Sequence, residues 1–282
     1  MNILLTELEK YGREYQLNQE KKYRDRKNNH WKIRIELAKK LVEMYSLPRL
    51  GAKETQEIIV VDVGCSIGTF AIEFAKMGYK SFGIDFDSSA IEIAKKLACE
   101  ENVSPVFVIG DVSDWKETID GIDIAIFFDI FEHLHDDELG SLLKSIKNAI
   151  SKGGSVVFHT FPTQYDYMFF GKKYLRWGLI PFKYLSPSKF NLITKAYASL
   201  YDIALLFKKG STYKELMKVS RHCNPLTSLR LKDILGGAGY ELLFLESSNL
   251  YDEEKSIQKQ FRNQPMSYRN LYGVAIPSDI RV

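Results

Sequence analysis

Short apolar runs alternate with amphipathic segments along most of this chain. The runs are rich in Val, Ile and Phe, which is typical of strands that are buried on both faces of a sheet. They predict strands at residues 58–62, 80–84, 105–109, 121–128, 154–161, 240–247 and 271–276. Helical spacing of apolar residues predicts helices at 31–44, 67–77, 88–99, 136–150 and 227–238, with Ser88 or Ser89 as a cap. Strands that alternate with helices predict an α/β fold with a doubly wound, mostly parallel sheet.

The segment from Ile58 to Asp85 has the organisation of a ligand-binding turn. Its first strand ends in Asp62, the chain turns through Gly64 and Gly68, and the second strand ends in Asp85. Open parallel sheets bind ligands beyond the carboxyl ends of their strands, and glycine lets the backbone approach a ligand closely. An acid 17 residues after the last glycine is placed to accept both hydroxyls of a ribose. The spacing Asp-x-Gly-x-x-x-Gly is not Gly-x-Gly-x-x-Gly, which makes a nicotinamide cofactor a poor candidate.

Four motifs in this chain resemble, in the same order, those of the class I S-adenosylmethionine-dependent methyltransferases. After the glycine turn come Gly110–Val112, Phe128–Leu134 and the Gly153–Gly154 turn. The resemblance covers residues 55–161, with a weaker similarity at 222–248. Within the family the chain resembles small-molecule and sugar O-methyltransferases of the ubiquinone-methyltransferase-like type. This resemblance implies a Rossmann-like sheet of seven strands in which the last strand is antiparallel.

The resemblance implies S-adenosylmethionine as the methyl donor and S-adenosylhomocysteine as the product. It assigns contacts with this cofactor to Asp62, Gly64, Cys65, Gly68, Asp85, Phe86, Asp111, Val112 and Asp129. Asp85 would accept the ribose hydroxyls, and Phe86 would pack on the adenine ring. Two alternatives remain open, because an acid at a strand end can simply cap the next turn and Phe86 can be a core aromatic.

Two histidines, His133 and His222, are candidate general bases. An imidazole can take a proton near neutral pH, which helps a weakly acidic hydroxyl to attack. The sulfonium methyl is already activated, so the protein has mainly to align the reacting atoms. In the alternative interpretation His133 only packs beside the methionyl part of the cofactor, and His222 is a loop residue.

A metal-assisted RNA 2′-O-methyltransferase is a rival interpretation of the same residues. In some relatives an acid-x-x-Glu-His stretch and a later histidine hold a divalent ion, and Asp129, Glu132, His133 and His222 stand in similar places. Asp129 replaces the usual Glu, however, and its shorter side chain reaches less far. We therefore expect no metal. A second rival is a non-catalytic module that binds S-adenosylmethionine.

Two segments of the chain do not follow the alternation of strands and helices. Residues 1–54 are predicted to be an N-terminal helical cap, and residues 55–282 the methyltransferase domain. Residues 162–221 interrupt the strand-helix alternation, and we expect them to form a helical lid with helices near 188–207 and 211–220.

The charge and aromatic content of this insertion indicate the acceptor. Between residues 161 and 223 eleven Lys or Arg accompany three acids, a net charge of +8, whereas the whole chain has +3. Aromatic rings stack on sugar faces, and cations pair with phosphate or carboxylate. The preferred acceptor is a small molecule, a sugar or glycan precursor, with an acidic one favoured by the charge. An ordinary solvated subdomain and contact with an anionic membrane surface are the alternatives.

Composition narrows the class of protein further. The longest apolar run, residues 122–130, is too short to span a bilayer, and the N-terminus lacks the pattern of a signal peptide. Cys65, Cys99 and Cys223 form no Cys-x-x-Cys motif, which favours a reducing compartment. No basic run of the RNA-binding type is present, so a nucleic-acid partner is not expected. The sequence predicts a cytoplasmic O-methyltransferase and is silent on its oligomeric state.

Overall fold

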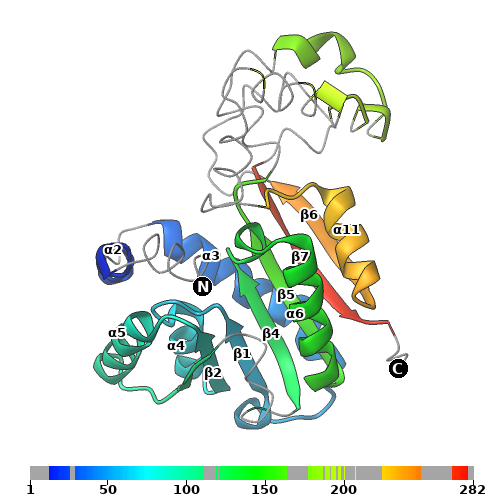
Figure 1. The fold of residues 1–282 in the computed structure, drawn as a ribbon. Helices are drawn as coiled ribbons and strands as arrows, with labels where there is room; N and C mark the ends of the chain where they lie inside the picture. The colour runs from blue at the N-terminus through cyan, green and yellow to red at the C-terminus, as the bar shows by residue number, and fades with distance from the viewer. Residues whose placement is uncertain are drawn as a thin grey trace.

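Seven strands form one sheet in the order β3-β2-β1-β4-β5-β7-β6. The protein is represented by a computed structural model that describes residues 13–25, 29–110, 119, 121–163, 177–186, 188–190, 192–194, 196–197, 200, 207, 224–248 and 269–278. The strands are β1 (Ile59–Val63), β2 (Lys80–Asp85), β3 (Val106–Ile109), β4 (Ile122–Phe128), β5 (Ile150–Thr160), β6 (Tyr240–Ser248) and β7 (Asn270–Pro277), as Figure 1 shows. Strands β1 to β5 are parallel to one another, whereas β7 is antiparallel to both β5 and β6. The predicted Rossmann-like sheet with its antiparallel last strand is therefore confirmed.

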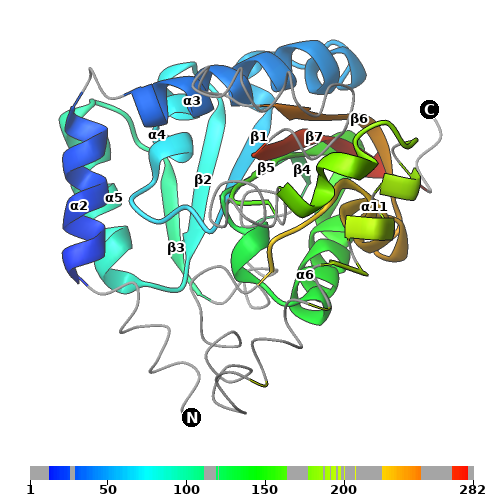
Figure 2. The ribbon, with the colours of Figure 1, turned by 90° about the horizontal axis from the view of Figure 1, so that it is seen from above.

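Helices cover both faces of this sheet. They are α2 (Arg13–Arg24), α3 (Asn29–Leu41), α4 (Thr69–Lys76), α5 (Ser88–Glu100), α6 (Asp136–Ala149) and α11 (Ser228–Gly237). Figure 2 shows α3 and α4 on one side of the strands and α6 and α11 on the other. Two apolar clusters fill the layers, one between the sheet and α6 and α11, the other between the sheet and α3 and α4. This double coverage explains why the strands are almost continuously apolar.

The helix after β2 begins one residue earlier than its two serines suggest. The carboxylate of Asp87 accepts hydrogen bonds from the N–H groups of Ser89 and Ala90, so Asp87 is the cap of α5. The prediction of Ser88 or Ser89 as this cap is wrong. Both residues lie inside the helix, because the acid at the preceding position satisfies the free N–H groups of the first turn.

The N-terminal helices lie against the body of the domain. Helix α3 continues into a π-helical turn, Val42–Ser46, and its apolar residues pack against the sheet. Helix α2 contacts α5. The predicted amphipathic helix at 31–44 is thus confirmed, with an earlier start.

The insertion after β5 is described only in part. Its described residues between 188 and 207 are all helical, as predicted, and Figure 1 shows them beyond the carboxyl end of β5. The helix predicted at 211–220 lies outside the described residues. None of the helices in the part of the chain that the structure describes is long and apolar enough to cross a membrane.

Candidate active site

The turn after β1 is built on two glycines in the left-handed region. Gly64 has φ +68°, and a Cβ added there would lie 2.4 Å from Cδ1 of Ile130. Gly68 has φ +76°, and its Cβ would lie 2.6 Å from the ring of Phe107. Neither position has room for a side chain, so main chain alone can line this turn. Between them Cys65 is buried, and its N–H donates to the Ile84 carbonyl at 2.9 Å.

Asp62 links the end of β1 to the helix that follows the glycine turn. Its carboxylate accepts the N–H of Ala71, in the first turn of α4, at 3.1 Å. Burial raises the pKa of Asp62 to about 7, because water is excluded from the charged form. The acid therefore fixes the start of α4 relative to β1. Its contact with the cofactor stays a prediction.

Asp85, at the end of β2, faces the same turn from the neighbouring strand. One carboxylate oxygen accepts the N–H of Ser66 at 2.7 Å, and the other accepts the N–H of Asp87 at 2.9 Å. Burial raises the pKa of Asp85 to about 6. Each oxygen still has a lone pair that can accept a hydroxyl, as the ribose assignment requires. The next residue, Phe86, is 47% exposed, which leaves its ring accessible to an adenine.

Helix α2 reaches this crevice through one side chain. The Ser66 hydroxyl donates to Oε1 of Gln16 at 2.9 Å, and Nε2 of Gln16 donates to Asp87 at 2.9 Å. Gln16 is only 3% exposed, although it belongs to a polar surface helix. Gln16 therefore joins α2 to Ser66 and Asp87, the two residues whose N–H groups donate to the Asp85 carboxylate. The sequence pattern gave no signal for this contact.

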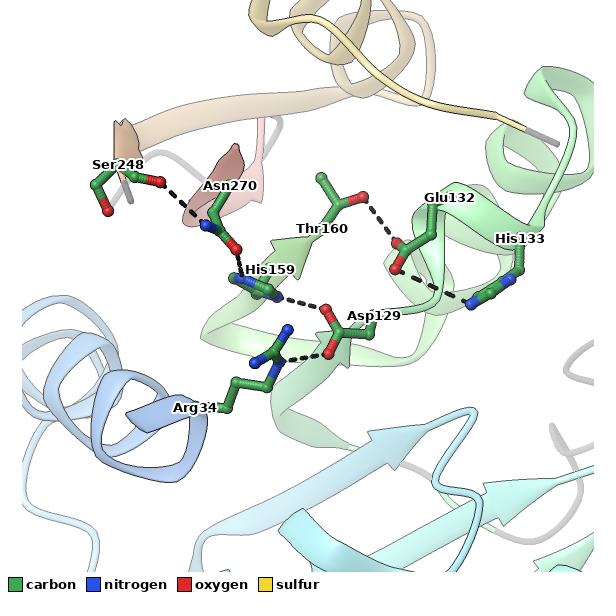
Figure 3. A network of polar contacts seen from close by, with 8 residues as sticks. All are labelled: Arg34, Asp129, Glu132, His133, His159, Thr160, Ser248 and Asn270. Carbon is green, nitrogen blue, oxygen red and sulfur yellow. Dashed lines mark hydrogen bonds and ion pairs between the residues drawn. The ribbon is translucent and has the colours of Figure 1, made fainter. Parts of the chain in front are cut away.

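Asp129 follows β4 in a left-handed conformation, with φ +58°. One of its oxygens accepts Nε of Arg34 from α3 at 2.6 Å, and the other bonds Nδ1 of His159 on β5 at 2.6 Å (Figure 3). The two partners hold the pKa of Asp129 well below its usual range, with Arg34 and then His159 outweighing the effect of burial. The Asp129 carboxylate therefore links the end of β4 to α3 and β5, and both of its oxygens already have a partner.

Glu132 and His133 lie on the short turn that follows. Oε2 of Glu132 accepts the Thr160 hydroxyl at 2.7 Å, whereas its buried Oε1 has no hydrogen-bond partner. Burial and the nearby Asp129 charge raise the pKa of Glu132 well above its usual range. Nε2 of His133 lies 4.0 Å from this Oε1, and the His133 side chain is 22% exposed (Figure 3). A buried, unsatisfied carboxyl oxygen therefore stands beside an accessible imidazole.

The segment after the insertion returns to this turn. The N–H of Asn224 donates to the Glu132 carbonyl at 3.0 Å, and its Nδ2 donates to the Leu134 carbonyl at 2.7 Å. Residue 224 therefore lies against the two residues that flank His133. His222 itself lies outside the described residues, as do Asp111 and Val112, and their assignments stay predictions.

The described acids and histidines can be examined for a metal-binding arrangement. Among the described residues, no group of three His, Cys, Asp or Glu side chains is placed to hold one. Both oxygens of Asp129 already have partners, because Arg34 and His159 bind them from opposite sides.

The residues at this turn suit a nucleoside cofactor in their chemistry. The glycine turn has main chain where side chains would not fit, and the Asp85 carboxylate lies at the next strand end. Both features lie at the carboxyl ends of parallel strands, where open sheets of this kind bind nucleosides. The fold therefore defines the Rossmann-like class, and the candidate site lies where sheets of this class bind nucleosides.

Comparison with known proteins identifies the family. Residues 33–244 match a family described as a methyltransferase domain, and the chain belongs to this family. It is similar to the ubiquinone biosynthesis O-methyltransferase of Alkalilimnicola ehrlichii, with 27% identity over 179 residues, 59% of this chain and 68% of that relative. The enzyme of that name from Nitrosomonas europaea is 26% identical over 181 residues, 58% and 71% of the two chains.

One solved structure supports the fold assignment. Magnesium protoporphyrin IX methyltransferase from Synechocystis PCC 6803 with bound SAH superposes with a TM-score of 0.51 at 14% identity, over 87% of this chain and 84% of that chain. This likeness concerns the fold. The family match shows that the protein is a methyltransferase, the class for which the sequence predicts S-adenosylmethionine as the methyl donor.

Proposed function

We propose that the enzyme methylates a hydroxyl oxygen of a small molecule and that His133 is the base that takes the hydroxyl proton. The observation that carries this proposal is the pairing of an accessible imidazole with the buried, unpartnered Oε1 of Glu132, 4.0 Å away. The raised pKa of Glu132 favours its neutral form at rest, whereas the imidazolium that forms when the proton arrives favours an ionised carboxylate beside it, so the two charges would form together. The relatives named as O-methyltransferases support transfer to oxygen.

The bound cofactor supplies a methyl group that needs no further activation. The protein then has two tasks, to align the acceptor oxygen and to remove its proton. Asp85 and the glycine turn serve the first task by fixing the nucleoside. His133 serves the second from the turn after β4, at the same edge of the sheet.

For the acceptor we propose a sugar or glycan precursor, preferably an acidic one. In the insertion, Trp177 is 67% exposed and Tyr184 is 87% exposed, and Nζ of Lys183 lies 4.7 Å from the centre of the Tyr184 ring. Exposed rings beside a cation suit a sugar face that carries an anionic group. A second candidate is an acceptor of the ubiquinone pathway, which the names of the two relatives favour.

A product screen tests these proposals directly. The protein is incubated with S-adenosylmethionine and sets of acidic and neutral sugars, ubiquinone-pathway hydroxyl compounds and short RNAs, with and without EDTA, and methylated products are found by mass spectrometry. We expect methylation of a sugar hydroxyl in the presence of EDTA. Products found only among ubiquinone-pathway compounds would select the second candidate. Methylated RNA that is lost with EDTA would contradict both candidates, and no product in any set would contradict turnover on these classes.

A further inference from the structure

A buried ion cluster at the end of β4 has no part in the proton transfer proposed above. Arg34 is among the largest fully buried side chains of the described residues, and its guanidinium reaches Asp129 across 95 positions of sequence. A buried cation costs several kcal/mol unless it is paired and hydrogen-bonded. Apolar residues of the same size often serve stability as well as a buried ion pair. Stability alone therefore does not account for this arrangement.

His159 bonds the same carboxylate and is held in place by a second hydrogen bond. Nδ2 of Asn270 donates to the Ser248 carbonyl at 3.1 Å, which turns Oδ1 of Asn270 toward Nε2 of His159 at 2.9 Å. Nδ1 of His159 faces the Asp129 carboxylate at 2.6 Å. Both ring nitrogens thus face oxygen atoms that can accept a hydrogen bond, an arrangement that a doubly protonated imidazole would satisfy. Phe128 stacks on the ring at 5.4 Å and helps to keep water from it.

The cluster joins three elements to one residue of unusual backbone. Arg34 from α3 and His159 from β5 bond Asp129 after β4, and Asn270 from β7 bonds His159 (Figure 3). A left-handed conformation is costly for a residue other than glycine unless its surroundings hold it. The N–H of Asp129 also bonds the His159 carbonyl at 2.9 Å.

The conformation of Asp129 decides where the next residue lies. Ile130 packs against Gly64 so closely that a Cβ on that glycine would touch its Cδ1. The ion cluster therefore acts on the glycine turn through Asp129 and Ile130. We propose that Arg34 and His159 are positioning residues, which hold Asp129 and the turn after β4 in the geometry that the cofactor site requires. This role does not depend on which acceptor the enzyme methylates.

A matched pair of variants separates positioning from stability. Lys53 pairs with the fully buried Asp123 at 2.7 Å, at the opposite end of the same strand. Arg34→Met and Lys53→Met each remove a cation that pairs with a carboxylate at one end of β4, Asp129 just after it and Asp123 near its start. We expect both to lower the melting temperature, but only Arg34→Met to weaken the binding of S-adenosylhomocysteine, by about tenfold or more in calorimetric titration. Unchanged affinity in Arg34→Met, or an equal loss in Lys53→Met, would overturn the proposal.

Two further measurements hold even if Arg34→Met fails to fold. Arg34→Lys keeps the charge but not the planar fork, so its affinity should lie between those of Arg34→Met and the wild type. If Arg34→Lys binds S-adenosylhomocysteine no better than Arg34→Met, the role of the charge is contradicted. If Arg34→Met does not fold, an affinity of Arg34→Lys more than about a hundredfold below that of the wild type contradicts it instead. In the wild-type protein, ¹⁵N NMR should show protons on both ring nitrogens of His159 at pH 7. One unprotonated ring nitrogen would show that the bridge between two cations does not exist.

Discussion

The carboxylate of Asp85 and the main-chain N–H of Ser66 are joined by a hydrogen bond of 2.7 Å. This bond fixes the glycine turn after β1 against the end of β2. The two strands are paired in parallel, so their carboxyl ends meet at one edge of the sheet.

Replacement of this acid by an amide should weaken cofactor binding. Asp85→Asn keeps the size of the side chain but removes the negative charge that accepts the ribose hydroxyls. We expect a loss of about 1.5–3 kcal/mol in the binding of S-adenosylhomocysteine, the range for a hydrogen bond to a charged group. Calorimetric titration measures it, with the exposed Asp137→Asn on α6 as the control. Equal affinities of the two variants would falsify the ribose assignment.

The same carboxyl should make cofactor binding depend on pH. The pKa of Asp85 is raised from 3.8 to about 6, and an acid with a raised pKa binds more protons in the folded state than in the unfolded state. The stability of the free protein should therefore fall as pH rises from about 4 to 6. Hydroxyl donors of the ribose favour the ionised carboxylate, so affinity should fall by up to about tenfold per pH unit below pH 6.

Thermal shifts measured from pH 5 to 8 check this dependence. The rise in melting temperature caused by S-adenosylhomocysteine should be small at pH 5 and reach a plateau above pH 6. Asp85→Asn cannot titrate, so its thermal shift should lose most of this slope. A ligand-induced shift that is constant with pH in the wild type would contradict the prediction.

The glycine turn should not tolerate even a methyl group at residue 64. Gly64→Ala combines a left-handed φ of +68° with a Cβ placed 2.4 Å from Ile130. We expect a loss of about 1–2 kcal/mol from the backbone conformation and about 1–3 kcal/mol from overpacking, with weaker cofactor binding. Gly140→Ala in α6 meets no atom within 4 Å and should be stabilising by about 0.5–1 kcal/mol. Urea unfolding of both variants gives the comparison.

Removal of the proposed base should slow turnover without changing cofactor affinity. His133→Gln keeps a polar side chain of similar length but cannot take a proton near pH 7, so kcat should fall by about 10²–10⁴-fold. The control is His135→Asn, two residues away, because asparagine can replace His135 as the cap of α6. A kcat of His133→Gln equal to that of the control would show that His133 is not the base.

The fold was readable from the sequence because its signals are local. Apolar runs, four of which end at glycine or aspartate, predicted all seven strands within a few residues. The largest error is the start of β5, which lies at Ile150 rather than residue 154. Gly153 and Gly154 indicated a turn there, but the chain keeps its pairing with β4 across an irregular register, with Gly153 at φ +86°.

Sequence reasoning predicted site residues only where they belong to a recognisable motif. Asp62 and Asp85 stand at fixed offsets from the glycines, and the structure brings them to one crevice. Arg34 gave no such signal, because a buried arginine on a helix resembles a solvated one until its partner, 95 residues away, is known. Gln16 was missed for the same physical reason, since its bonds to Ser66 and Asp87 join segments that are remote in sequence.

The hydrogen bonds of the Gln16 carboxamide also affect the choice of an N-terminal truncation site for expression. A fragment that starts at β1 would keep every recognisable motif, yet it would discard the amide that bridges the rim of the nucleoside crevice. Boundaries drawn from motif content alone would therefore remove this bridge together with α3, whose apolar residues cover one face of the sheet.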